Sequence, residues 1–175
     1  MRVADYVIEF FENQGVDHIF TVSGGGSIFL CDALAIAKKM KYVACHHEQA
    51  ASMSTEAYAR VRQGLGVTLV TTGPGATNAI TAVAGAWIES VPLMIISGQV
   101  KRADMLKGAP LRQKGVQEVD IVSMVKSVTK YAVTVEYPED IRAVMEQAAS
   151  LARNGRAGPV WIDVPLDVQG APIDP

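Results

Sequence analysis

Apolar residues recur near the start of the chain at the spacing of one face of an α-helix. They stand at i, i+3, i+4, i+7 and i+8, as Val3, Tyr6, Val7, Phe10 and Phe11. The stripe predicts an amphipathic helix that ends near Gly15, because glycine commonly follows the last helical residue. A second stripe opens with Pro138 and ends before Gly155, and it predicts a helix of the same kind near the carboxyl end.

Short apolar runs alternate with helical segments along the rest of the chain. The runs predict strands, at residues 18–22, 42–45, 66–71, 93–97, 131–135 and 159–164. The segments between them predict helices, at residues 27–38, 49–62, 76–88 and 119–125. The polar stretch 99–115 predicts a long loop. This alternation predicts an α/β fold of three layers, with helices on both faces of a mostly parallel sheet of about six strands.

In such sheets, ligands bind at the carboxyl ends of the strands. The segments that come directly after predicted strands are Ser23–Gly26, His46–Glu48, Thr72–Gly75 and Ser97–Gln99. Their glycines match neither the dinucleotide fingerprint nor the P-loop. Two interpretations stay open for them: tight strand-to-helix turns, or close approach of backbone to a flat or anionic ligand.

The triplet His46-His47-Glu48 has metal-ligand side chains in an unsuitable geometry. Consecutive side chains alternate on a strand and lie about 100° apart on a helix, so three of them rarely converge on one ion. We therefore predict no metal site here. Glu48 is either a first-turn carboxylate favoured by the helix dipole or a functional acid at the ligand-binding edge. Asp163 and Asp167 flank Pro165, and we expect them to cap turns.

Composition narrows the class of protein further. The 175 residues are 49% hydrophobic and 19% charged with a net charge of −2, which suits one compact domain. We expect no nucleic-acid partner because a basic face is missing, and no membrane because no uncharged apolar run reaches roughly 18 residues. With no apolar leader at its start, the chain is expected to be cytoplasmic. Cys31 and Cys45 are expected as buried reduced thiols, and Trp87 and Trp161 as core residues.

Taken together, the motifs resemble one known family. The chain is similar to the pyrimidine-binding (PYR) domain of thiamine-diphosphate enzymes of the acetohydroxyacid synthase, pyruvate oxidase and benzoylformate decarboxylase group, and most similar to acetolactate-synthase-like proteins. The resemblance runs over nearly the whole chain, in the segments 47–51, 56–60, 72–78, 90–92, 97–100, 117–120, 129–130 and 158–165.

The sequence departs from the synthase pattern at three places. Residues 105–112 look like an insertion before Gln117. Val116 stands where true synthases usually have Phe, and Ser23-Gly24-Gly25 stands where they commonly have Tyr-Pro-Gly-Gly. These positions border the expected substrate pocket, so the resemblance leaves the product open.

The resemblance implies a cofactor and a set of site residues. In this family, a glutamate at the position of Glu48 hydrogen-bonds the aminopyrimidine N1′ of thiamine diphosphate and so promotes loss of the C2 proton. The implied catalytic residues are Glu48 and Gln117. The residues implied to bind the cofactor are Ser23, Gly24, Gly25, Glu48, Thr72, Pro74, Gly75 and Asn78.

The resemblance also implies missing parts. The family holds the diphosphate through Mg²⁺ on a Gly-Asp-Gly motif of a separate PP domain, and this sequence has no such motif. We therefore expect residues 1–165 to be the PYR domain and residues 166–175 to begin a linker to a central domain. Further expectations are a PP domain of the same or a partner chain and a 2-oxo acid substrate.

The PYR domains are expected to form a homodimer or tetramer through the helix after Glu48, at Ala50, Ala51, Met53 and Ala57. The complete enzyme would be a carboligase or decarboxylase, that is a transferase or lyase. The isolated chain is expected to be inactive. A non-catalytic small-molecule-binding module and an interaction domain that keeps only the fold remain the alternatives.

Overall fold

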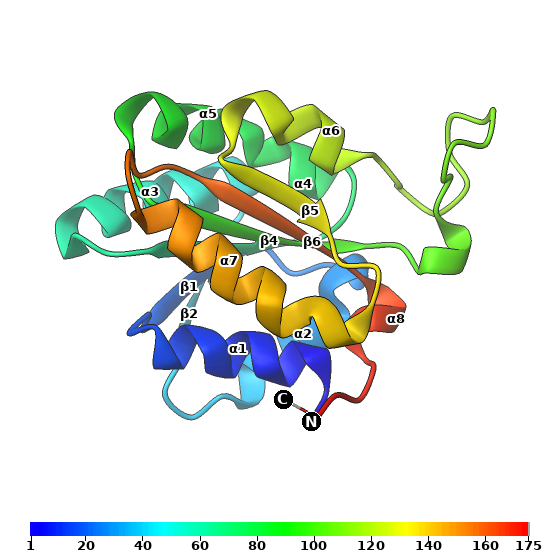
Figure 1. Ribbon diagram of the computed structural model, residues 1–175, viewed down its shortest axis with the longest axis horizontal. Helices are drawn as coiled ribbons and strands as arrows, with labels where there is room; N and C mark the ends of the chain where they lie inside the picture. The colour runs from blue at the N-terminus through cyan, green and yellow to red at the C-terminus, as the bar shows by residue number, and fades with distance from the viewer. Residues whose placement is uncertain (175) are drawn as a thin grey trace.

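The computed structural model describes residues 1–174 and contains an open sheet between two layers of helices (Figure 1). Neighbouring strands are all parallel, and their order is β2-β1-β3-β4-β6-β5. The strands are β1 His18–Thr21, β2 Lys41–Ala44, β3 Gly66–Val70, β4 Leu93–Gln99, β5 Tyr131–Thr134 and β6 Val160–Pro165. The predicted α/β class with a mostly parallel sheet is confirmed.

Two groups of helices cover the two faces of the sheet (Figure 1). One face carries α1 Val3–Asn13, α2 Ile28–Ile36, α7 Ile141–Arg153 and α8 Leu166–Gln169. The other carries α3 Glu48–Arg62, α4 Pro74–Asn78, α5 Ile80–Glu89 and α6 Ile121–Val125. No helix within residues 1–174 is long and apolar enough to cross a bilayer.

The hydrophobic pattern explains the two layers. Helix α1 buries Val3, Val7 and Phe11 completely or nearly so against one face of the sheet. Strand β4 lies in the middle of the sheet and is buried along its whole length, which is why its run of apolar residues is continuous rather than alternating. On the opposite face, Ile95 and Trp161 pack with the small residues of α5.

Some sequence predictions were wrong in detail. The single helix predicted at 76–88 is two helices, α4 and α5, which meet at Ala79. Trp161 is fully buried as expected, whereas Trp87 is 40% exposed because it lies near the end of α5. Cys31 and Cys45 are free thiols but only half-buried, since they border a hollow between α2 and β2.

The tail packs against the domain over its described residues, although the sequence predicted a linker there. In α8, Val168 and Gln169 are fully buried. Pro172 forms a bridge with Arg2, and Ile173 packs on the core under α1. A linker that leads from this packed tail to a further domain therefore remains a proposal.

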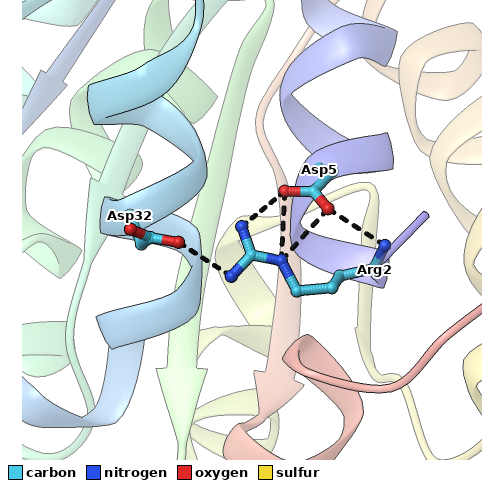
Figure 2. A network of polar contacts seen from close by, with 3 residues as sticks. All are labelled: Arg2, Asp5 and Asp32. Carbon is cyan, nitrogen blue, oxygen red and sulfur yellow. Dashed lines mark hydrogen bonds and ion pairs between the residues drawn. The ribbon is translucent and has the colours of Figure 1, made fainter.

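The N-terminal segment lies beside the tail and is tied to two helices by ion pairs (Figures 1 and 2). The Arg2 guanidinium donates from Nη2 to Asp5 at 2.6 Å and from Nη1 to Asp32 on α2 at 2.7 Å. The hydrogen bonds from Arg2 hold the pKa of Asp5 below its usual range. The first turn of α1 is thereby fixed against α2, next to the chain terminus.

Candidate functional site

The turns that leave β1 and β3 meet the last residues of β4 at the carboxyl edge of the sheet. A Cβ on Gly98 would lie 2.0 Å from the carbonyl oxygen of Gly26, and one on Gly24 would lie 2.5 Å from the Cβ of Thr71. The Gly26 N–H donates to Thr71 Oγ1 at 3.1 Å. Gly24, Gly26 and Gly98 are therefore required so that the turns can pack on one another. Gly25 differs, because a Cβ there would meet nothing within 4 Å.

Glu48 opens α3 at this edge, directly after the His47 cap, whose Nδ1 accepts the Gln49 N–H. Its Oε2 accepts a hydrogen bond of 2.9 Å from Nδ2 of Asn78 on α4. A Cβ on Gly75 would lie 3.1 Å from Glu48 Oε1, so the first turn of α4 carries glycine where the carboxylate lies. The structure thus brings three of the predicted site residues together: Glu48, Gly75 and Asn78.

Glu48 is half-buried. The reason lies in the preceding strand β2, an edge strand whose four residues are all exposed. Within residues 1–174, no hydrogen bond reaches Oε1 of Glu48. This oxygen is left free at the rim of the turn.

Gln117 lies on the other side of the same turn. Its backbone has a φ of 58°, and its carbonyl oxygen would be 2.0 Å from a Cβ on Gly73, whose φ is 63°. Both values lie in the left-handed region, which costs a residue other than glycine about 1 kcal/mol or more. The turn at 73–75 therefore touches Gln117 at one end and Glu48 at the other.

A pocket of about 290 Å³ opens beside Gln117, and neither Glu48 nor the segment 73–75 lines it. Predicted site residues in its wall are Gly25, Thr72 and Gln117, and Val116 and Gln99 line it too. Ser23 is not among them. It borders a separate hollow of about 250 Å³ together with Thr21, Cys31 and Cys45.

Glu118 shapes the loop that carries Gln117, and the sequence did not single it out. Its carboxylate accepts backbone N–H groups from Leu106 at 2.5 Å, Gly115 at 3.1 Å and Lys114 at 3.3 Å. The apparent insertion 105–112 is thus hydrogen-bonded through Leu106 to Glu118, the residue next to Gln117. Nothing local in the sequence indicates this, because the donors lie up to twelve residues away.

A buried polar network lies beneath the pocket and was also missed. Asp163 accepts from Ser97 Oγ at 2.6 Å, from Gln99 Nε2 at 3.1 Å and from Thr134 Oγ1 at 3.2 Å. Burial raises the pKa of Asp163 to about 7, against the opposing effect of those three hydrogen bonds. Asp163 therefore lies inside β6 and does not cap a turn, while Asp167 pairs with Arg102 at 2.7 Å.

Within residues 1–174, no group of three metal-ligating side chains comes together. The site instead offers a carboxylate oxygen, an amide and a set of glycine turns, at the position where a doubly wound sheet binds its ligands.

Residues 1–124 match the family described as thiamine pyrophosphate enzyme, N-terminal TPP binding domain. The chain belongs to this family. The resemblance inferred from the Glu48, Gly73 and Gln117 segments is thereby confirmed.

Relatives of this TPP-binding domain include the acetolactate synthase large subunit of Buchnera aphidicola (subspecies Schizaphis graminum) and acetolactate synthase isozyme 3 large subunit of Escherichia coli K12. Each is 41% identical over 165 residues, which is 94% of this chain and 28% of the relative. The chloroplastic acetolactate synthase of Arabidopsis thaliana is 40% identical over 166 residues, 95% of this chain and 24% of the relative. The chain spans about a quarter of the length of these relatives.

The residues present fit the aminopyrimidine half of thiamine diphosphate. The glycine turns leave backbone exposed around Gly25, where a flat ring can approach. The free Oε1 of Glu48 offers a hydrogen-bond acceptor, or a donor when protonated, to a ring nitrogen. The donor set lacks the clustered oxygens that a Mg²⁺ ion prefers.

Proposed function

We propose that this TPP-binding domain holds the aminopyrimidine of thiamine diphosphate with Glu48 facing N1′. The observation that carries the proposal is the Glu48 carboxylate, with one oxygen bound by Asn78 and the other free at the glycine turn. When bound, thiamine diphosphate supplies an acidic C–H carbon that attacks the carbonyl of 2-oxo acids.

The protein's own residues have distinct parts in this proposal. Glu48 holds a proton at N1′, and the Asn78 amide keeps its carboxyl oriented. The aminopyrimidine ring is surrounded by the segments that carry Ser23, Gly24, Gly25, Thr72, Pro74 and Gly75. Gln117 acts from the wall of the neighbouring pocket, where a substrate would lie against Val116.

We further propose the setting of the whole enzyme. The relatives named acetolactate synthase support a carboligase or a 2-oxo acid decarboxylase, a transferase or a lyase, in which this domain meets a PP domain that carries Mg²⁺. The isolated chain would then be inactive, because the charged contacts that hold the diphosphate lie outside it. A cytoplasmic location is part of the proposal, since free Cys31 and Cys45 suit a reducing compartment.

A PYR-to-PYR contact through α3 completes the proposal, as a homodimer or tetramer. Ala50, Met53 and Ala57 are exposed along one side of the helix, as a close helix contact requires. Ala51 is excluded from that surface, because it is fully buried against the sheet. The proposed contact therefore includes Ala50, Met53 and Ala57 but not Ala51.

The test of the cofactor assignment is Glu48→Gln in the natural full-length protein. The amide keeps the size of the side chain and its contact with Gly75, but it cannot exchange a proton with N1′. We expect exchange of the cofactor C2–H into deuterated solvent to slow by about 10² or more, as seen when an acid–base catalyst is removed.

Glu139→Gln serves as the matched control, because Glu139 is exposed in the turn just before α7, on the other layer. Equal rates of C2–H exchange in wild type and Glu48→Gln would contradict the proposed role of Glu48 at N1′. Glu48 would then be only a first-turn carboxylate of α3. Cofactor binding without any C2–H exchange would instead support a non-catalytic binding module.

A further inference from the structure

Gln99 lies at the carboxyl end of β4 beneath the pocket, and every hydrogen-bonding position of its amide is occupied. The residue is 2% exposed. Nε2 donates to Asp163 Oδ2 and to the Val119 carbonyl, each at 3.1 Å. Oε1 accepts from Thr72 Oγ1 and from the Val100 N–H, each at 2.9 Å. Two donors and two acceptor sites are all that a primary amide offers.

Asp163 fixes the orientation of the Gln99 amide. Asp163 already accepts hydrogen bonds from Ser97 and Thr134 and receives a third one from Gln99. Turning the amide over would point an N–H at the Val100 N–H and leave an oxygen facing the Val119 carbonyl. Such mismatches would leave buried polar groups without partners, so a single orientation is held.

Two of the four hydrogen bonds of Gln99, those with Thr72 and Val119, connect it to the two sides of the pocket. Thr72 directly precedes the turn 73–75 that touches Glu48, and Val119 lies two residues after Gln117. These walls also meet directly, at the left-handed residues Gly73 and Gln117. Backbone in that region persists only where its surroundings over-determine it.

We propose that Gln99 is a positioning residue that sets the Glu48 turn and the Gln117 segment relative to one another, with Asp163 fixing its amide. The consequence for catalysis rests on the proposed function, whereas the mechanical coupling of the two walls does not. Neither Gln99 nor Asp163 needs to touch the cofactor or the substrate in this role.

The test compares three variants of the natural full-length protein without cofactor. Thr72→Val is close in shape and removes only the hydroxyl that bonds Gln99. Gln99→Leu removes the whole amide. Thr134→Val removes a hydroxyl that bonds the same Asp163 but contacts no wall of the pocket. The measurement is backbone hydrogen exchange, monitored by mass spectrometry, in segments 72–76 and 116–120.

For Thr72→Val we expect both segments to exchange about tenfold faster, as the loss of one buried hydrogen bond predicts. Thr134→Val should leave both segments at the wild-type rate. If Gln99→Leu fails to fold, Thr72→Val alone is sufficient for the test, because it keeps the hydrogen bond from Gln99 to Asp163. Faster exchange in segment 72–76 alone, or equal effects from Thr134→Val, would overturn the coupling.

The same variants then receive thiamine diphosphate. In Thr72→Val we expect a larger loss in the rate of C2–H exchange than in cofactor affinity, because the ring site stays while its alignment is lost. Equal losses in affinity and rate would contradict a positioning role. Failure of the wild type to bind the cofactor would refute the proposed function but leave the exchange result on Gln99 standing.

Discussion

At the scale of single residues, the site depends on where glycine is required and where it is merely present. Gly25 faces open space, while Gly75 lies against the side chains of Thr71 and Glu48. The two positions are two turns of the same sheet edge, so they form a matched pair for substitution.

Gly75→Ala should destabilise the domain by about 1–3 kcal/mol, the range for overpacking. The new Cβ would lie 2.6 Å from Thr71 Cγ2 and 3.1 Å from Glu48 Oε1, so one of those groups must move. Gly25→Ala should stay within about 0.5 kcal/mol of wild type in unfolding free energy. Urea unfolding of both variants measures the difference, and equal stabilities would show that the turn adapts freely.

Asp163 makes stability depend on pH. Its pKa is about 7 in the folded chain against an ordinary value of 3.8, so the folded state keeps a proton that the unfolded state releases. Stability should therefore fall as pH rises from about 4 to 7, by at most about 1.4 kcal/mol per pH unit, and level off above that.

Asp163→Asn should be less stable than wild type at low pH but should lose this slope, because the amide does not titrate. Unfolding free energies between pH 4 and 8 measure it, with the exposed Asp174→Asn as the control. A slope that survives in Asp163→Asn would assign the pH dependence to another group.

At the scale of elements, the short helix α8 joins the tail to the site. Gln169 donates from Nε2 to the carbonyl oxygens of Gly26, at 2.7 Å, and Val164, at 2.8 Å. Leu166 lines the same pocket as Gln117. The tail therefore supports the first glycine turn as well as closing the core.

Deletion of residues 166–175 should cost about 3 kcal/mol or more, since it uncovers the core sites of Val168 and Ile173. Deletion of only residues 174 and 175 is the control and should leave the thermal midpoint nearly unchanged. A fully stable fragment 1–165 would show that the domain ends at Pro165, the boundary expected from the sequence.

At the scale of the whole molecule, the proposed PYR-to-PYR contact is confined to one side of α3. A charge at its centre must be desolvated on association, so Met53→Glu should weaken the assembly of the full-length protein by at least tenfold. Ile36→Glu places the same charge on an exposed apolar site of the opposite layer and should have no effect. Sedimentation at several concentrations measures the association of both variants. Equal association of Met53→Glu and Ile36→Glu would show that the contact is not on this side of α3.

The chain's own periodicities determined the elements, the α/β class and the edge where the chemistry lies. Apolar stripes and short β-branched runs are local, and they place Glu48 and Thr72 after strands without further information. Gln117 lies in the loop beyond β4 and entered only through the family resemblance. What only the tertiary structure decided is which groups meet. The bonds of Asn78 to Glu48, of Gln99 to Thr72 and Asp163, and of Gln169 to Gly26 join residues 27 to 143 positions apart. The half-burial of Glu48 was also beyond prediction, because it depends on β2 lying at the edge of the sheet. Contacts of this kind arise from strand order and packing, which local hydrophobic patterns do not encode.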